Sequence, residues 1–364
     1  MAQALYTQDY LSALQAQRRA LEIVFGPVLF QVARIMRKIG LLDLLSRRTV
    51  RKGLTLSEIC EDLSRSRYSV QVLLESAMSG GLVCRECGTN GDPERYRLTK
   101  TGYLLNGDEM TTVLMDFMHD VCYRGLFELE KALDTGEPEG LKAAGDWPSI
   151  YEALNSLPSP MRESWFRYDH YFSDCTFDGA FKVVFDPPPR SLVDVGGNTG
   201  RWALQCINHD PTVQVTVVDL PQQIALMKET IRGMPGSERI TGWETDFLQA
   251  DASLPSAPDV IWMSQFLDCF NEEQITDILK LAADTMNRET RLYINEVYWD
   301  RQRFETAAFV VMQSSPYFTA IANGQSKFLF FPDIERCIEA AGLRAERHRD
   351  GLGWGHTLTL CRLA

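Results

Sequence analysis

The strongest structural signal in the sequence is an apolar strand that runs into a glycine turn and then into a helix. Residues 191–196 have the sequence Ser-Leu-Val-Asp-Val-Gly, the turn continues through residue 200, and a helix is expected through Trp202, Leu204 and Ile207. Glycine is needed in such a turn when a ligand approaches the main chain, because a Cβ would stand in its way. The segment predicts the first strand of an α/β domain.

Further strand patterns alternate with helical ones after this turn. We expect strands at 213–218, 239–243, 259–263 and 291–297, and a helix from about residue 272 to 286. This alternation is typical of a doubly wound, mostly parallel sheet of the Rossmann-like α/β class. Ligands of such sheets bind at the carboxyl ends of the strands, so the glycine turn marks the expected site.

The chemistry of the turn selects among nucleotide-type ligands. A dinucleotide fingerprint that starts at Gly196 needs glycine at position 198, where this chain has Asn198, and no Gly-Lys-Ser/Thr follows for a phosphate. Asp219 ends the next strand about twenty residues later, where a carboxylate can accept hydrogen bonds from both hydroxyls of a ribose. A cofactor with a ribose but no phosphate, such as a sulfonium with an amino-acid tail, fits these residues.

Residues 54–105 carry the pattern of a winged helix-turn-helix. Thr55 and Glu58 have the spacing of a capping box before a first helix, and apolar residues recur at helical spacing from 70 to 78 in a second one. Gly80 and Gly81 are expected to end that helix in a left-handed conformation. Two short strands then form the wing, at 82–85 and 96–98, with a hairpin turn at Asn90-Gly91.

The charge distribution bears on what the winged helix does. The chain has a net charge of −12, and residues 1–110 carry 15 basic against 12 acidic side chains, which leaves 22 against 37 for the rest. An acidic body is a poor platform for a phosphate backbone, and Arg67 is the one clear cation in the expected recognition segment 66–79. We therefore expect the winged helix to pair subunits, and we expect no nucleic-acid partner.

The segment ahead of the winged helix points the same way. Residues 10–45 have an apolar-rich helical pattern, which suits contact with a second copy of the chain; packing on its own domain is the alternative. Residues 1–30 lack a secretory signal and no stretch is long enough to span a bilayer, so a cytoplasmic protein without membrane contact is expected. The nine cysteines include one isolated Cys-x-x-Cys pair, at 84 and 87, and no metal site is expected.

Residues 110–186 are expected to form a helical connector. Its aromatic and methionine side chains suit either a packed core or the wall of a pocket for a flat organic substrate. Pro187-Pro188-Pro189 cannot continue a helix and marks the next boundary. The sequence thus predicts three parts, at 1–109, 110–186 and 187–364. The side chains that characterise the connector include Met115, Phe117, Met118, Trp147, Tyr151, Trp165, Phe166, Tyr168, Tyr171 and Phe172.

Taken together, these segments resemble the plant-type and bacterial small-molecule O-methyltransferase family. The resemblance spans nearly the whole chain and includes Ile39-Gly40-Leu41-Leu42-Asp43 and Tyr96-Arg97-Leu98-Thr99 in the first part. The segments of the last part are Val193-Asp194-Val195-Gly196-Gly197-Asn198-Thr199-Gly200, Val218-Asp219-Leu220-Pro221, Thr245-Asp246-Phe247, Phe266-Leu267-Asp268-Cys269-Phe270-Asn271-Glu272-Glu273 and Ile294-Asn295-Glu296.

The resemblance implies a class I methyltransferase domain that binds S-adenosyl-L-methionine, preceded by a winged-helix domain that forms a homodimer. It places Gly196 beside the methionine part of the cofactor and Asp219 at the ribose. Asp246 is implied to accept the exocyclic amine of the adenine, and Phe247 to pack on its face. An ordinary strand-end or loop acid is the alternative for Asp219 and Asp246. The full set of implied cofactor contacts is Asp194, Gly196, Gly197, Asp219, Leu220, Asp246, Phe247 and Ser264.

One departure from the family falls at its proton acceptor. The family usually has Leu-His-Asp-Trp where this chain has Leu267-Asp268-Cys269-Phe270, so Asp268 replaces the histidine that takes the proton of the substrate hydroxyl. Glu296 matches one family glutamate, whereas a second, near residues 326–331, has no clear counterpart. The pKa of a phenol is near 10 and that of an ordinary aspartate near 3.9, so proton transfer between them is uphill by about six units, or ~8 kcal/mol. Transfer to a histidine is uphill by only ~5 kcal/mol.

There are several ways in which this difference in pKa could be reduced or avoided. Burial can raise the pKa of Asp268 by several units, or the substrate can be more acidic than a phenol. Another histidine can serve as the base, with His170 as the first choice and His356 and His119 after it. Asp268 can also simply cap the helix that starts near residue 271.

The sequence therefore supports a main hypothesis and alternatives. The main hypothesis is an S-adenosylmethionine-dependent methyltransferase that acts on a hydroxyl of a small aromatic molecule, with Asp268, Glu296 and His170 as candidate catalytic residues. The first alternative keeps the cofactor but performs other chemistry, such as hydroxylation. The second is a catalytically weak binding or regulatory protein with its winged helix on DNA, against which the acidic body counts.

Overall fold

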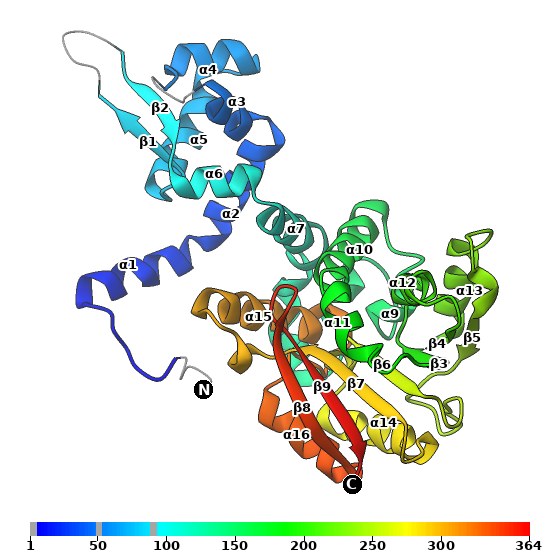
Figure 1. Ribbon diagram of the computed structural model, residues 1–364. Coiled ribbons are helices and arrows are strands. Elements are labelled where there is room, and N and C mark those ends of the chain that lie inside the picture. The colour runs from blue at the N-terminus through cyan, green and yellow to red at the C-terminus, as the bar shows by residue number, and fades with distance from the viewer. Residues whose placement is uncertain (1–5, 49–52, 88–92) are drawn as a thin grey trace. The chain divides into compact units, whose positions relative to one another are not determined.

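A seven-stranded sheet forms the centre of the C-terminal part of the chain in this computed structural model, which describes residues 6–48, 53–87 and 93–364. The strand order is β5-β4-β3-β6-β7-β9-β8; the first five of these strands are parallel, and β9 runs antiparallel to both of its neighbours (Figure 1). The Rossmann-like fold class is confirmed. The strands are β3 (Ser191–Val195), β4 (Gln214–Asp219), β5 (Ile240–Glu244), β6 (Val260–Ser264), β7 (Arg291–Val297), β8 (Leu343–Leu352) and β9 (His356–Leu363).

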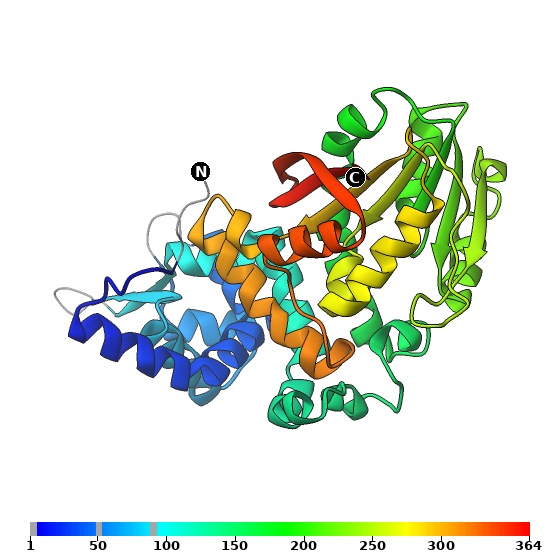
Figure 2. The same cartoon turned by 90° about the horizontal axis from the view of Figure 1, so that it is seen from below.

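Helices cover both faces of the sheet because its strands are apolar on both sides. On one face, α11 (Phe177–Val184), α12 (Arg201–His209) and α13 (Pro221–Thr230) pack in a cluster that includes Trp202 stacked on Trp262 of β6, with ring centroids 4.5 Å apart. On the other, α14 (Glu272–Thr285) and α16 (Phe331–Ala340) pack side by side (Figure 2). Pro221 occupies the first turn of α13, as expected.

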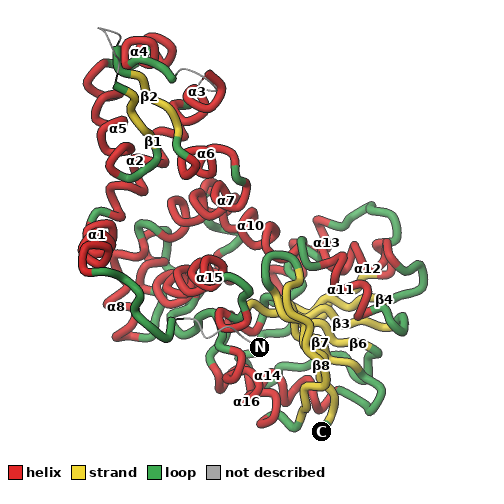
Figure 3. The backbone as a smooth tube through the Cα atoms, turned by 60° about the vertical axis from the view of Figure 1, so that its left-hand side comes forward, coloured by secondary structure: helices red, strands yellow, loops and turns green. Residues whose placement is uncertain are grey.

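A helical layer precedes the sheet in the chain, and part of it returns after β7. Its apolar cluster joins residues far apart in sequence, and the indole N–H of Trp165 donates to the hydroxyl of Tyr317 at 2.7 Å. Figure 3 shows α10 and α15 as neighbouring helices beside the sheet. The elements are η1 (Met118–Cys122), η2 (Gly125–Glu128), α8 (Leu129–Thr135), η3 (Glu139–Ala143), α9 (Ile150–Ala153), α10 (Ser159–Asp174), α15 (Glu305–Tyr317) and η7 (Phe318–Ala322). Short turns complete the unit at η4 (Ser237–Arg239), η5 (Leu267–Cys269) and η6 (Trp299–Arg301).

The chain divides into two compact units, one of residues 6–116 and one of residues 117–364. The division falls between Asp116 and Phe117, because Phe117 already belongs to the aromatic cluster of the helical layer. Residues 117–186 of the expected connector are thus packed in the same unit as the sheet, whereas residues 110–116 belong to the first unit. This matters for function, because the helical layer supplies one wall of the pocket described below.

The first unit contains the expected winged-helix elements. The capping box of Thr55 and Glu58 is present, with the Glu58 N–H donating to Thr55 Oγ1 at 3.2 Å. Gly81 has a left-handed φ of +74°, whereas Gly80 has φ −83°, so one glycine alone makes the turn. The expected Asn90-Gly91 turn lies outside the described residues. The elements are α1 (Ala13–Val24), α2 (Gly26–Lys38), α3 (Leu41–Arg48), α4 (Leu56–Leu63), α5 (Arg67–Ser79), β1 (Val83–Glu86), β2 (Arg95–Leu98), α6 (Lys100–Gly107) and α7 (Glu109–Phe117).

The apolar pattern of residues 10–45 forms three helices and not one long one. Pro27 stands in the first turn of α2, where its missing N–H costs nothing, and Gly40 takes a left-handed φ of +79° before α3. Many apolar side chains of α1 and α2 are exposed within this unit. Across the described residues, no helix combines the length and the apolar content that crossing a bilayer requires. The exposed side chains are Leu11, Leu14, Leu21, Ile23, Val24, Phe25, Val28 and Ile35.

Candidate active site

A cavity of about 270 Å³ opens at the carboxyl ends of the parallel strands. One side is formed by the turns that follow β3, β4, β5 and β6, and the other by aromatic side chains of the helical layer. The crevice between β3 and β6 is where the strand order reverses, which is the usual ligand position in a doubly wound sheet. All eight expected cofactor contacts line this cavity: Asp194, Gly196, Gly197, Asp219, Leu220, Asp246, Phe247 and Ser264.

The glycine turn leaves no room for side chains. Gly196 has φ +70°, and its N–H donates to the carbonyl of Val218 at 2.8 Å. A Cβ on Gly196 would collide with the ring of Phe266, and one on Gly197 would lie 2.6 Å from Asp194 Oδ2. Both positions therefore need glycine in this structure, because protein side chains already occupy the space that a Cβ would take.

Asp194 lies buried beneath this turn. Its Oδ2 has no hydrogen-bond partner, and burial, together with the nearby charge of Asp219, raises the pKa of its carboxyl to about 8. A carboxyl with this pKa carries a proton for much of the time at neutral pH. It can therefore donate to a ligand or to the turn above it.

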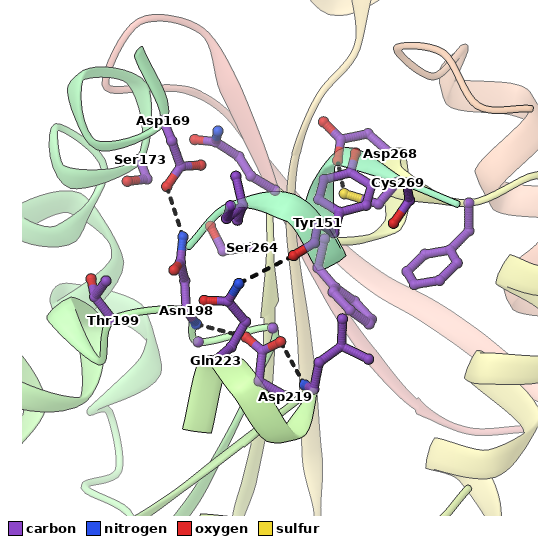
Figure 4. Close-up of a pocket in the computed structure, with 18 of the residues that line it drawn as sticks. Tyr151, Asp169, Ser173, Asn198, Thr199, Asp219, Gln223, Ser264, Asp268 and Cys269 are labelled. Carbon is purple, nitrogen blue, oxygen red and sulfur yellow. Dashed lines mark hydrogen bonds between the residues drawn. The ribbon is translucent and has the colours of Figure 1, made fainter. Parts of the chain in front are cut away.

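Asp219 connects the turn to the second strand. Its Oδ2 accepts the N–H of Asn198 at 2.9 Å and its Oδ1 accepts the N–H of Leu220 at 2.8 Å (Figure 4). Burial raises the pKa of this carboxyl to about 6, although the two N–H donors act in the opposite direction. Each oxygen keeps lone pairs beyond its single main-chain partner, which is what recognition of two adjacent hydroxyls requires.

Asp246, Phe247 and Ser264 continue the same wall. The carboxylate of Asp246 accepts the N–H of Leu248 at 3.0 Å, so it also stabilises its own turn. The ring of Phe247 lies edge-on to that of Phe266, with centroids 5.3 Å apart, and leaves a flat apolar surface toward the cavity. Ser264 Oγ accepts the side-chain amide of Asn295 at 2.9 Å.

Asp268 lies in the short turn η5 and is 4% exposed. Burial raises the pKa of its carboxyl to about 7, against the weaker effect of the Cys269 thiol, whose Sγ lies 3.5 Å from Oδ1. The alternative that Asp268 caps the following helix is wrong. Asn271 is the N-cap of α14, because its side chain accepts the N–H of Gln274 and completes a capping box.

Glu296 lies behind this turn, at the end of β7, and is fully buried. Its Oε1 accepts the N–H groups of Phe266 and Leu267, both at 2.9 Å, and its Oε2 has no hydrogen-bond partner. Burial, and then the charge of Asp268, raises the pKa of Glu296 well above its usual range. Glu296 thus fixes the main chain that carries Asp268.

The three candidate histidines lie in different environments. His170, on α10, lines the cavity; burial and the charge of Arg201 lower its pKa to about 4, and its Nε2 is buried without a partner. His356, on β9, is buried behind the cavity with Nε2 3.0 Å from Gln265 Oε1. His119, in η1, lies 2.7 Å from Asp120 Oδ1. His170 is therefore the histidine that the structure brings to the cavity.

Two family domains match this chain: a Dimerisation2-like domain at residues 17–90 and an O-methyltransferase domain at residues 180–342. The chain belongs to the O-methyltransferase family. The second match begins within α11 and covers the parallel strands and the turns that line the cavity, together with Asp219, Asp268 and Glu296.

Individual relatives of this methyltransferase align over most of its length. It is 23% identical over 339 residues to an L-tyrosine C(3)-methyltransferase of Streptomyces lavendulae, which covers 91% of this chain and 88% of the relative. It is 27% identical over 266 residues to the norreticuline-7-O-methyltransferase of Papaver somniferum, covering 70% and 69%. Human N-acetylserotonin methyltransferase, solved with S-adenosylmethionine, shares the fold with a TM-score of 0.65 at 19% identity, covering 99% of each chain.

Several residues of the methyltransferase site were not singled out from the sequence. Asn198 takes a left-handed φ of +49° in the turn, and its side-chain amide lies 3.4 Å from Asp169 Oδ2 (Figure 4). Burial, and then the charges of Asp174 and Asp268, raises the pKa of Asp169 to about 7. The residue next to it, His170, was singled out because histidine is a familiar base, whereas an aspartate on a helix gives no such signal.

The aromatic wall contains side chains that the sequence placed either in a core or in a pocket. In the methyltransferase they do both, since Trp165 and Tyr317 belong to the buried cluster of the helical layer and also line the cavity. Tyr151 contributes a hydroxyl that is buried without a hydrogen-bond partner, close to Cys269 and Asp268. The other aromatic residues of this wall are Tyr168, Phe318 and Phe328, whereas Phe270 lines the cavity from just after the turn η5.

Proposed function

We propose that this protein is an S-adenosylmethionine-dependent O-methyltransferase that acts on a hydroxyl of a small aromatic molecule. The observation that carries the proposal is that one cavity is lined both by the turn that suits a ribose and by a buried carboxyl whose pKa is raised to about 7. Membership of the O-methyltransferase family supports the same activity.

The residues present fit the proposed cofactor. Gly196 and Gly197 line the cavity, so their main chain lies beside a ligand bound there, and Asp219 has acceptor capacity for both ribose hydroxyls. We propose that Asp246 accepts the exocyclic amine of the adenine and that Phe247 packs on its face. Leu220 and Ser264 complete the contacts on either side, and Asp194 supports the turn from below.

When bound, the cofactor supplies an electrophilic methyl group. The protein's own part is to hold the acceptor ring against the aromatic wall, to exclude water, and to take up the proton of the hydroxyl. We assign that last role to Asp268. With a carboxyl pKa of about 7, the mismatch to a phenol near 10 falls to about three units, or ~4 kcal/mol, instead of ~8 kcal/mol for an ordinary aspartate.

Glu296 and His170 take different roles in this proposal. Glu296 is a positioning residue, because it holds the N–H groups of the turn that carries Asp268. His170 lines the cavity, but with a pKa near 4 it is a weaker base than Asp268. Asp268 is therefore the better proton acceptor of the two. In this proposal Asp268 takes the role of the family histidine, and Glu296 holds it in place.

The first unit supports a homodimer. The Dimerisation2-like match covers residues 17–90, and the exposed apolar side chains of α1 and α2 are available for a second copy. We propose that the winged helix pairs subunits, with no nucleic-acid partner. We also propose a cytoplasmic location, in keeping with the nine free cysteines.

Label transfer tests the activity. The protein is incubated with S-adenosylmethionine labelled at the methyl group and with a panel of hydroxylated aromatics, and products are separated and located by mass and NMR. A labelled methyl ether is expected. Label on a ring carbon would retain methyl transfer but contradict the hydroxyl acceptor. Turnover of the aromatic with intact cofactor would favour hydroxylation instead, and tight cofactor binding without transfer to any acceptor would contradict the proposal.

A further inference from the structure

The ionisable side chains that line the cavity are mostly acidic. Among the described residues of its lining, six are acidic and two are basic, namely His170 and Arg201. Arg201 is not free, because its guanidinium pairs with Asp174, with Nε 3.1 Å from Oδ1. His170 is neutral at physiological pH, since its pKa is lowered to about 4. The acids are Glu152, Asp169, Asp194, Asp219, Asp246 and Asp268.

Two of these carboxyls, Asp169 and Asp268, belong to opposite walls of the cavity. Asp169 projects from α10 in the helical layer and Asp268 from the turn after β6, and the two are drawn on opposite sides of the view in Figure 4. Both side chains line the same cavity, and the charge of Asp268 is one cause of the raised pKa of Asp169, after burial and the charge of Asp174. An aromatic molecule that fills the space beside Asp268 therefore also experiences Asp169.

Neither carboxyl forms an ion pair with a basic side chain of the described residues, although the charge of Arg201 lowers the pKa of Asp169 in part. Asp169 accepts the side-chain amide of Asn198 at 3.4 Å, and Asp268 accepts the thiol of Cys269 at 3.5 Å. Within the described residues, no ion pair involves either carboxyl. Above a pH of about 7, where both carboxyls are ionised, a negatively charged substituent in this cavity would face two acidic side chains that no ion pair neutralises, and juxtaposed like charges are strongly unfavourable at such sites.

We infer that the methyl acceptor is a neutral or amine-bearing hydroxyarene, and that aromatic acids are excluded by the carboxyls of Asp169 and Asp268. The inference rests on the proposed function and narrows its substrate class by charge. A neutral phenol leaves the acids as they are, whereas an ammonium group on the acceptor gains an attractive partner in Asp169. A carboxylate on the acceptor meets repulsion from both walls.

Binding of matched phenols tests the inference without relying on turnover. Each set shares one hydroxylated ring and differs only in a substituent that is an amine, an uncharged group or a carboxylate, as in tyramine, 4-ethylphenol and 3-(4-hydroxyphenyl)propionate. Sets built on phenol, catechol and naphthol are titrated by calorimetry at pH 8 into the full-length protein saturated with S-adenosylhomocysteine. The amine and the neutral compound are expected to bind at least about tenfold more tightly than the acid.

The outcomes separate this inference from the proposed function. An acid that binds as tightly as its neutral partner would overturn the charge selection while leaving methyl transfer intact. Failure of every set to bind, with normal S-adenosylhomocysteine affinity, would contradict an aromatic acceptor and with it this inference.

A charge-removing variant identifies the residue responsible. Asp169→Asn is expected to raise the affinity for the acid relative to the neutral phenol by about tenfold. Glu163→Gln, on the same helix but exposed, is the matched control and should leave the ratio unchanged. An unchanged ratio in Asp169→Asn would overturn the role of Asp169. If that variant instead loses affinity for S-adenosylhomocysteine alone, Asp169 serves the cofactor, and its assignment to the acceptor is wrong.

Discussion

The main-chain N–H of Asn198 donates to Asp219 Oδ2 at 2.9 Å, so the glycine turn after β3 is joined to the carboxyl end of β4. The other oxygen of Asp219 accepts the N–H of Leu220 at 2.8 Å. A single carboxylate thus fixes two segments that are adjacent in the sheet and about twenty residues apart in the chain. Its remaining acceptor capacity faces the cavity, which makes Asp219 both a structural and a ligand-binding group.

Replacing Asp219 by alanine is expected to weaken cofactor binding. Hydrogen bonds to a charged acceptor contribute about 1.5–3 kcal/mol, so the dissociation constant for S-adenosylhomocysteine should rise by about tenfold to a hundredfold in calorimetry. Glu244→Gln is the control, because Glu244 is the exposed register partner of Asp219 at the end of β5. Equal affinities for Asp219→Ala and the parent protein would refute the ribose assignment.

Replacing Asp268 by asparagine is expected to lower kcat by about 10² to 10⁴, the range that general-base catalysis provides. The affinity for S-adenosylhomocysteine should stay the same, because the change preserves shape and leaves the glycine turn intact. His170→Gln is the matched comparison and should alter kcat by less than about threefold. The opposite pattern, with His170→Gln inactive and Asp268→Asn active, would transfer the role of the base to His170.

The pH dependence follows from the raised pKa of Asp268. Its carboxyl can accept a proton only when ionised, so kcat should be low below the pKa of about 7 and rise toward a plateau above it. An unperturbed aspartate would already be active near pH 5. A profile of kcat from pH 5 to 9 with saturating cofactor checks this, and a flat profile over that range would show that Asp268 does not titrate in the catalytic step.

Gly196→Ala is expected to lower the free energy of unfolding by more than the cost of placing an alanine at a left-handed φ. The change adds a Cβ that collides with the ring of Phe266, in addition to the strain of φ +70°, which costs of order 1 kcal/mol. Gly233→Ala is the matched control, since Gly233 has φ +75° with open space around it. Thermal unfolding should show a clearly larger loss for Gly196→Ala; equal losses would mean that Phe266 moves aside freely.

The exposed apolar face of α1 should control the oligomeric state. The double variant Leu14→Glu with Leu21→Glu places two charges on one side of this helix and is expected to convert a dimer into monomers, as measured by light scattering. Tyr68→Glu is the control, because Tyr68 is 80% exposed on α5 of the same unit. Persistence of the dimer in the double variant would locate the interface elsewhere.

The parallel half of the fold follows closely from the sequence. Strands β3, β4 and β6 are largely apolar, and each ends at or just before a polar or glycine residue where the site lies; β7 carries Glu296 next to its last residue. The antiparallel pair β8 and β9 was not predicted, because the outer strand β8 is mostly polar and exposed along its length. Edge strands of this kind lack the apolar pattern that identifies a strand.

The cofactor side of the site was more predictable than the acceptor side. The turn at Gly196 and the acid at 219 are local features with fixed spacing, and the structure brings them together. The raised pKa of Asp268 depends on packing by segments distant in sequence, and the approach of Asp169 depends on which side of α10 faces the sheet. Neither property is encoded in a short motif. The sequence therefore identified Asp268 as a candidate base but did not predict the burial that raises its pKa.

The two walls of the cavity have separate origins in the chain. The wall for the sulfonium is made of turns whose shape follows from strand register, whereas the aromatic wall is made of α9, α10 and the α15–η7 segment, which lie outside the parallel run. Substitutions in these helices can reshape the acceptor compartment without moving β3 or β4. If these helices were exchanged for those of a relative, the selectivity for the methyl acceptor should change with them. The cofactor site at the ends of β3 and β4 should stay the same.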